Sequence, residues 1–189
     1  TRVKAPTTDD GVKLSRLLKY LNGSVDNVQV LRPREDMLLG GYIDASWGCH
    51  SDGKSHSGLV VTLGGCNVLC MSSKQKLVTR DSTEAELVAL SDKMMNVLKC
   101  YEFLVDQGQD CEVPVLLQDN TSTITLVTEG GGQYRTKYMR ARQAFVKERV
   151  DAGEVVIQYL PTGRMLADIL TKALQGAVFR YLARRITGQ

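Results

Sequence analysis

The sequence predicts an α/β fold with a five-stranded mixed sheet flanked by helices. Three apolar runs of strand length follow one another, with short turns rich in glycine and serine between them, and this pattern is typical of an antiparallel meander. Helical periodicity then alternates with two short apolar runs, which indicates strands that are joined in parallel through crossover helices. The predicted strands cover residues 38–47, 57–63, 67–72, 113–118 and 154–160.

The helices are predicted from the spacing of apolar residues and from the residues at their ends. In the longest helix, from Ser82 to about Gln107, apolar residues recur at three- and four-residue steps until Gly108 ends the pattern. Further helices are predicted at 119–129, at 137–151, where the helix is basic, and in a last helical region from about residue 164. The predicted order is therefore β-β-β-α-β-α-α-β-α.

Residues 1–36 are predicted to form a connecting segment, separate from a main domain at 37–189. Apolar residues at near-helical spacing after two acidic residues predict one helix at 9–22. A short strand is predicted at 27–32.

The composition limits the class of protein. Hydrophobic residues make up 43% of the chain and charged residues 24%, which is typical of a folded globular domain. The net charge of +3 is too small to indicate a polyanionic partner by itself, so local clusters of basic residues have to carry that argument. No apolar run is long enough to span a membrane, and the five cysteines form no C-x-x-C pair of the kind that binds zinc.

Asp44 is the one acidic residue for which local structure offers no simple explanation. It lies in the apolar stretch "LLGGYIDASWG", where a buried strand is predicted, and an ionised group there is costly unless something neutralises it. Acidic residues at the ends of other predicted elements are Glu84 or Glu86, Asp119 and Asp168. Helix capping would explain the glutamates and Asp119, and an ion pair with Lys172 at i,i+4 would explain Asp168.

One arrangement explains all four acids together, namely convergence around divalent cations. Clustered carboxylates repel one another, and they persist where cations lie between them. Ligands that are all oxygen atoms favour Mg²⁺ or Mn²⁺. Two such ions, roughly 4 Å apart, would activate a water molecule and stabilise the leaving oxygen of a phosphodiester.

From about Leu38 onward, the chain resembles the ribonuclease H domain of copia-type LTR retrotransposon Pol polyproteins. The matching segments keep their order: "YIDASWG", "SHSGLVVTLGG", "SSKQKLVTRDSTEAELVALSD", "LQDNTSTI", "YRTKY" and "VDAGEVVIQYLPTGRMLADILTKAL". Residues 2–37 resemble the segment that joins the reverse transcriptase to that domain.

The resemblance implies a ribonuclease H-like fold and an endoribonuclease that hydrolyses the RNA strand of RNA–DNA hybrids during reverse transcription. It implies that Asp44, Glu86, Asp119 and Asp168 are both catalytic and metal-binding, with two Mg²⁺ ions for which Mn²⁺ substitutes. Periodicity leaves Glu84 and Glu86 open, because they lie about 80° to either side of the apolar stripe, whereas the family pattern prefers Glu86. The implied partners are the hybrid and the reverse transcriptase domain of the same polyprotein, with no membrane. The implied location is the cytoplasm, within a virus-like particle, or the nucleus.

Basic and small polar residues near these acids are predicted to bind the hybrid. Basic side chains would contact phosphates, and small polar ones could read a 2′-hydroxyl, although a solvated surface is the alternative for each. The predicted residues are Ser73, Lys74, Lys76, Arg80, Thr83, Asn120, Arg135 and Lys137. Trp47 is predicted to pack in the core rather than to stack on a base.

Two other functional classes stay open. Tyr138 stands where the family usually has a histidine after "RTK", so the alternative to an active nuclease is a catalytically weak or inactive nucleic-acid-binding scaffold with the same fold. A transfer enzyme such as an integrase or resolvase is compatible with the fold, but it fits the "STEAE" and "ADILTK" segments poorly.

Overall fold

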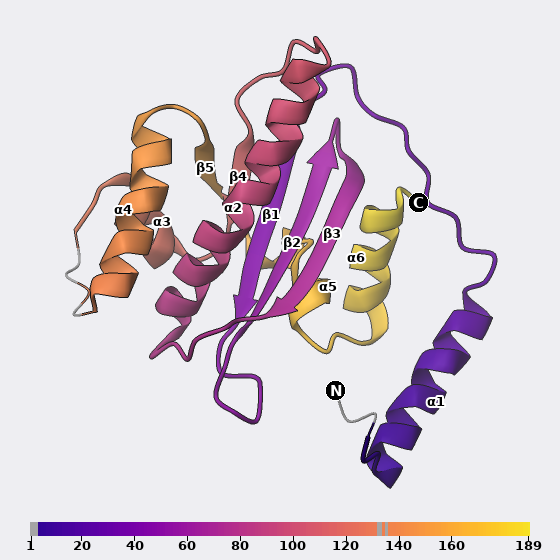
Figure 1. Ribbon diagram of the computed structural model, residues 1–189. Helices are drawn as coiled ribbons and strands as arrows, with labels where there is room; N and C mark the ends of the chain where they lie inside the picture. The colour runs from indigo at the N-terminus through magenta and orange to yellow at the C-terminus, as the bar shows by residue number, and fades with distance from the viewer. Residues whose placement is uncertain (1–3, 132–133, 135) are drawn as a thin grey trace.

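The computed structural model describes residues 4–131, 134 and 136–189. In the described chain, a mixed sheet has the strand order β3-β2-β1-β4-β5 (Figure 1). The strands are β1 (Leu39–Ser46), β2 (His56–Leu63), β3 (Cys66–Lys74), β4 (Val115–Gln118) and β5 (Val156–Tyr159). The first three strands are antiparallel neighbours, while β4 lies parallel to β1 and β5 parallel to β4. The predicted α/β class and the mixed sheet are therefore confirmed.

Helices cover both faces of the sheet (Figure 1). The helices of the described chain are α1 (Thr8–Gly23), which lies apart from the sheet, α2 (Ser82–Asp106), α3 (Thr121–Thr128), α4 (Lys137–Asp151), the 3-10 turn η1 (Thr162–Arg164), α5 (Asp168–Thr171) and α6 (Gly176–Thr187). No helix in the described ranges combines the length and the apolar character that a bilayer crossing needs.

Alternating side chains on the strands build a separate apolar cluster on each face of the sheet. Leu59 and Val61 of β2 join the larger cluster beneath α2, whereas Val60 between them packs with residues of the α5–α6 region. This follows from the two-residue period of a strand, which sends successive side chains to opposite faces. Helices α2 and α5 are thereby held against opposite faces of the same strands.

Close packing of α5 against β2 depends on Gly58, which pairs with Asp44 across the β1–β2 ladder. A Cβ atom at this position would lie 2.8 Å from the Thr171 methyl and 3.0 Å from the Ala167 carbonyl oxygen. A Cβ atom needs more room than these distances leave. Glycine at this position therefore permits α5 to approach β2, next to Asp44 on β1.

The N-terminal segment differs from its prediction at residues 27–32, where no strand forms. The Val30 N–H donates instead to the Thr187 carbonyl oxygen at 2.7 Å, at the end of α6. Backbone groups of this segment thus bond to a helix end rather than to a sheet edge. Helix α1 has no buried residue, and its Tyr20 ring contacts the Phe179 ring edge-on at 5.8 Å between centroids.

The last helical region, predicted to run on from residue 164, is interrupted. Helix α5 ends where Lys172 adopts an extended backbone, with φ −119° and ψ 142°. Gly176 has φ +65°, a conformation that favours glycine, at the start of α6. The interruption makes α5 a short helix that carries Asp168 and lies against the sheet.

We predict that Gly58→Ala lowers the free energy of unfolding by about 1–3 kcal/mol, because the new methyl group overpacks the β2–α5 contact. Thermal unfolding should show this as a fall in Tm of several degrees. Gly11→Ala is the matched control, since a Cβ atom there meets nothing within 4 Å. An unchanged Tm for Gly58→Ala would show that α5 does not need the glycine.

Candidate metal centre

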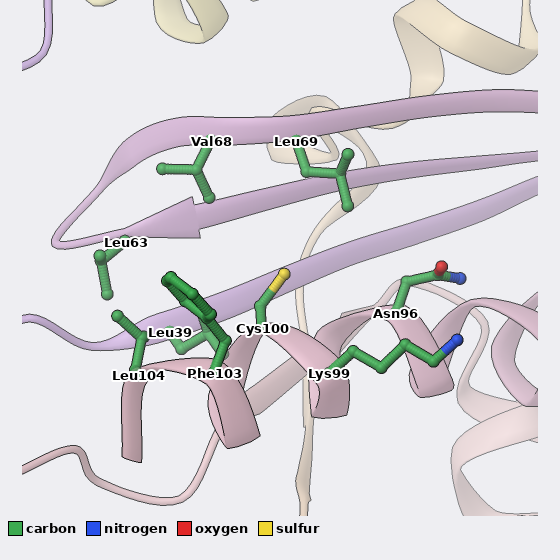
Figure 2. A pocket seen from close by; sticks show the side chains of 9 residues that line it. All are labelled: Leu39, Leu63, Val68, Leu69, Asn96, Lys99, Cys100, Phe103 and Leu104. Atoms are coloured by element: carbon green, nitrogen blue, oxygen red, sulfur yellow. The ribbon is translucent and has the colours of Figure 1, made fainter. Parts of the chain in front are cut away.

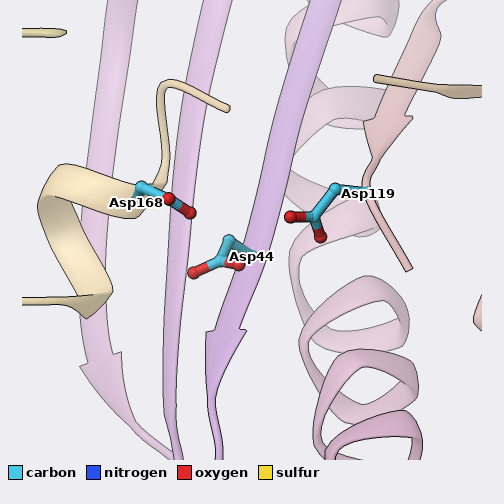
Figure 3. Close-up of side chains that lie close together, drawn as sticks. All are labelled: Asp44, Asp119 and Asp168. Atoms are coloured by element: carbon cyan, nitrogen blue, oxygen red, sulfur yellow. The ribbon is translucent and has the colours of Figure 1, made fainter. Parts of the chain in front are cut away.

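Three aspartates from different elements converge at one edge of the sheet. Asp44 comes from β1, Asp119 directly follows β4, and Asp168 begins α5. A carboxylate oxygen from each lies within 4.8 Å of those of the other two. Figure 3 shows Asp44 between the other two side chains. Asp44 is 1% exposed and Asp168 6% exposed, so two of the three carboxylates are almost fully removed from water.

Glu86 borders this group without being part of it. Its Oε1 accepts a hydrogen bond from the Ala45 N–H at 3.2 Å, and its Oε2 accepts one from Gln118 Nε2 at 3.2 Å. The Glu86 side chain, on α2, thus bridges Ala45 of β1 and Gln118 of β4. Glu86 therefore lies beside the three aspartates, on the α2 side of the sheet.

Glu84 faces a different partner. Its carboxylate pairs with the Arg80 guanidinium, with an Nη2–Oε1 distance of 2.7 Å, and also accepts from the Arg80 N–H. The cap of α2 is Asp81, whose side chain accepts from the Glu84 N–H. Helix capping therefore does not account for the carboxylate of Glu84 or of Glu86. Of these two glutamates, Glu86 is the one that contacts strands β1 and β4.

Each aspartate has a polar neighbour that fixes its orientation. Asp44 accepts a hydrogen bond from the Thr171 hydroxyl, and Asp119 accepts one from the Thr162 hydroxyl at 2.7 Å. Lys172 Nζ lies 2.7 Å from Asp168 Oδ1 and 3.4 Å from Asp44 Oδ1. The i,i+4 spacing predicts the Lys172–Asp168 pair, whereas no sequence pattern indicates either threonine.

Burial and neighbouring charges raise the pKa of two acidic groups at this site. Burial, followed by the charge of Asp44, raises the pKa of Glu86 well above its usual range. Burial likewise raises the pKa of Asp168 to about 6, opposed by its hydrogen bond to Lys172. A nearby positive charge stabilises the ionised form of a buried carboxyl group. The donor set, three carboxylates with oxygen atoms within 4.8 Å of one another, is compatible with a divalent cation that takes oxygen ligands.

The predicted hybrid-binding residues divide by whether they already have a partner. Lys74 pairs with Asp52 at 2.8 Å, and Arg80 pairs with Glu84. Lys76 and Lys137 are exposed, and no ion pair is found for either among the described residues. Arg135 lies outside the described residues.

The small polar residues of that set serve the fold in part. Ser73 accepts a hydrogen bond from the largely buried Lys93 at 2.7 Å. Asn120 caps α3 by accepting from the Thr123 N–H. The Thr83 carbonyl accepts from the Thr123 hydroxyl at 3.5 Å, and Thr83 as a whole is partly exposed.

Two further expectations concerned aromatic residues. Trp47 is 53% exposed, and its Nε1 donates to the Thr79 carbonyl oxygen at 3.0 Å, so the prediction that it packs in the core is wrong. Tyr138 is a partner of Arg142, which lies over its ring and pairs with Asp92 of α2. Tyr138, which stands in place of the family's histidine, thus takes part in a contact between α4 and α2.

An apolar pocket of about 500 Å³ lies at the opposite end of β1 (Figure 2). Leu39, Leu63, Cys100 and Phe103 line it, with no acidic residue in its described lining. It lacks the converging polar groups that mark a reaction site.

We predict that metal-free protein loses stability relative to Asp168→Asn as pH rises from about 4 to about 7. The raised pKa of Asp168, about 6 in the folded chain against 3.8, means that the folded state holds a proton that the unfolded state releases. The stability that Asp168 contributes below the pKa of its unfolded state is therefore lost as pH rises through the pKa of its folded state. Urea denaturation in EDTA across this range measures the difference. Glu102→Gln, an exposed change on α2, should follow the wild type, and a constant difference between wild type and Asp168→Asn would contradict the prediction.

Comparisons with known proteins agree with this fold. No protein-family model matches the chain. The Retrovirus-related Pol polyprotein from transposon RE2 of Arabidopsis thaliana is 32% identical over 183 residues, which is 96% of this chain and 13% of that polyprotein. The corresponding polyprotein from transposon TNT 1-94 of Nicotiana tabacum is 28% identical over 91% of this chain and 13% of its own length.

Solved structures of similar shape are ribonucleases H. LC11-RNase H1, isolated from compost by a metagenomic approach, superposes with a TM-score of 0.55 and 17% identity, over 71% of this chain and 92% of that one. The N-terminal RNase H domain of a Mycobacterium tuberculosis protein superposes with a TM-score of 0.50 and 14% identity, over 78% and 97% of the two chains. The chain therefore belongs to the retrovirus-related Pol polyproteins of transposons, as a segment with the ribonuclease H fold.

Proposed function

We propose that this segment is a divalent-metal-dependent endoribonuclease that hydrolyses the RNA strand of RNA–DNA hybrids during reverse transcription. The observation that carries the proposal is the convergence of Asp44, Asp119 and Asp168 within 4.8 Å, with Glu86 beside them, on a ribonuclease H fold. LC11-RNase H1 has also been solved in complex with an RNA/DNA hybrid, and this chain superposes on it with a TM-score of 0.50. Burying several carboxylates together costs free energy unless cations neutralise them, and such groups cluster at functional sites.

The residues of the centre have distinct tasks in this proposal. Asp44, which lies between Asp119 and Asp168 (Figure 3), would hold the divalent ions together with these two aspartates and Glu86. Two Mg²⁺ ions, or Mn²⁺ in their place, supply water activation and stabilisation of the leaving 3′-oxygen when bound. The Thr162 hydroxyl orients Asp119, and the Thr171 hydroxyl orients Asp44. Glu86 holds the backbone of β1 and completes the negative charge of the site.

Partners and location follow from the same proposal. The hybrid would lie over the edge that carries the aspartates, with exposed Lys76 and Lys137 available to its phosphates. The reverse transcriptase domain of the same polyprotein would supply the hybrid. Cleavage of the hybrid would take place in the cytoplasm, within a virus-like particle, or in the nucleus.

We predict that Asp44→Asn lowers hybrid cleavage by more than about 100-fold, since loss of a residue that merely supports a metal ligand already costs about 10–100-fold. Affinity for the hybrid should stay equal or rise slightly, because a negative charge is removed. A labelled RNA annealed to DNA, incubated with Mg²⁺, Mn²⁺ or EDTA, measures the first effect, and an electrophoretic shift in EDTA measures the second.

Asp106→Asn, at the exposed end of α2, is the control for that experiment and should cleave like the wild type. Cleavage by Asp44→Asn at the wild-type rate would overturn the assignment of the site. Wild-type binding without cleavage under both metals would instead favour the non-catalytic scaffold.

We predict that Lys76→Ala and Lys137→Ala each weaken hybrid binding and reduce the slope of log affinity against log salt by about 1. Lys74→Ala and Arg80→Ala should have smaller effects, because those side chains are already paired with Asp52 and Glu84. Fluorescence anisotropy across a salt series measures both quantities. Lys19→Ala, on exposed helix α1, removes the same charge elsewhere and should leave the slope unchanged; an equal loss in all variants would indicate only a net-charge effect.

A further inference from the structure

Lys172 occupies a position unlike that of other cationic side chains in the described chain. Its Nζ contacts two carboxylates that belong to the candidate metal centre, Asp168 at 2.7 Å and Asp44 at 3.4 Å. The side chains of those aspartates are 9% and 2% exposed, whereas that of Lys172 is 35% exposed. Other ion pairs found among the described residues join each cation to a single carboxylate, on partly or fully exposed surfaces for the most part.

The local sequence holds Lys172 in this place. It lies four residues after Asp168, so the turn of α5 brings its stem back over the aspartate, and its own N–H donates to the Asp168 carbonyl oxygen at 2.9 Å. The preceding residue, Thr171, donates its hydroxyl to the second oxygen of Asp44. Two consecutive residues therefore serve both oxygens of Asp44, one with a hydroxyl and one with an ammonium.

We propose that the Lys172 ammonium is the built-in counter-cation of the metal-free centre, and that a divalent ion has to displace it from Asp168 and Asp44. The inference rests on the proposed function, because it concerns the same carboxylates. The ammonium pairs with Asp168 Oδ1 and Asp44 Oδ1, and both carboxylates belong to the group that a bound ion would also need. An ammonium and a dication at one pair of oxygens also repel each other at short range. The partly exposed lysine has a flexible four-carbon stem that can carry its charge out to solvent.

This arrangement has two consequences. The affinity of the centre for a divalent ion is lowered by competition with a cation of the same chain. In the absence of metal, the same cation stabilises the fold, because it offsets the repulsion between two buried carboxylates. Removing the lysine charge should therefore change both quantities, in opposite directions.

The test compares Lys172→Gln with the wild type in calorimetric titrations of Mn²⁺ into the protein alone, without nucleic acid. We expect the dissociation constant of Lys172→Gln to be lower by about ten-fold, equivalent to removal of about 1.4 kcal/mol of competing interaction. Lys13→Gln is the matched control, since Lys13 forms an i,i+4 pair with Asp9 at 2.7 Å on exposed helix α1. It changes the net charge equally and should bind Mn²⁺ like the wild type.

Thermal unfolding supplies a second readout. In EDTA, Lys172→Gln should melt below the wild type, and saturating Mn²⁺ should raise its Tm by more than it raises that of the wild type. Lys172→Met, which keeps the apolar stem, serves if the glutamine variant does not fold, and Lys172→Arg, which keeps the charge, should show no tightening.

Equal or weaker Mn²⁺ affinity in the Lys172→Gln and Lys172→Met variants overturns the inference, as does an absence of binding in every variant. Hybrid cleavage by the wild type is measured in parallel. Cleavage together with unchanged Mn²⁺ affinity in the variants refutes only the competition, while an absence of cleavage with tightened affinity refutes only the proposed nuclease.

Discussion

The mutual repulsion of buried carboxylates is the constraint on which the structure of this centre depends. Asp44, Asp119 and Asp168 approach within 4.8 Å, and burial removes most of the water that would screen Asp44 and Asp168. Such an arrangement persists only if the surrounding fold is stable enough to impose it and if positive charge is close at hand. Burial, with a smaller contribution from the charge of Asp44, raises the pKa values of Glu86 and Asp168.

The fold imposes the arrangement through elements that are stabilised elsewhere. Strands β1 and β4 are parallel neighbours, so Asp44 near the end of one and Asp119 after the other reach the same edge of the sheet. Ile43, next to Asp44, is fully buried in the larger apolar cluster, and Gly58 gives α5 the space to bring Asp168 to the opposite face. Apolar packing on both faces thus fixes the backbone positions from which the acids project.

How much the sequence predicts depends on whether a residue's partner is local. Asp44 stands out because a carboxylate within an apolar strand has no neighbour in sequence that would explain it. Periodicity does not separate Glu84 from Glu86, because the choice depends on Arg80 and on strands distant in sequence. The strand predicted at 27–32 fails for a similar reason: its apolar pattern suits an extended chain, but the backbone partner is the end of a helix.

The roles of Thr162 and Thr171 carry no such sequence signal, and the i,i+4 spacing that predicts the pair of Lys172 with Asp168 does not indicate its contact with Asp44. These residues nevertheless decide how the centre behaves without metal. Hydroxyl groups hold Asp119 and Asp44 in orientation, and the ammonium supplies positive charge. In small zinc domains, metal binding and folding are a single event, because nothing else holds the ligands together. Here the chain supplies its own cation and its own apolar core. In the proposed centre, folding would thereby be separated from metal binding, and divalent ions would exchange while the sheet beneath stays intact.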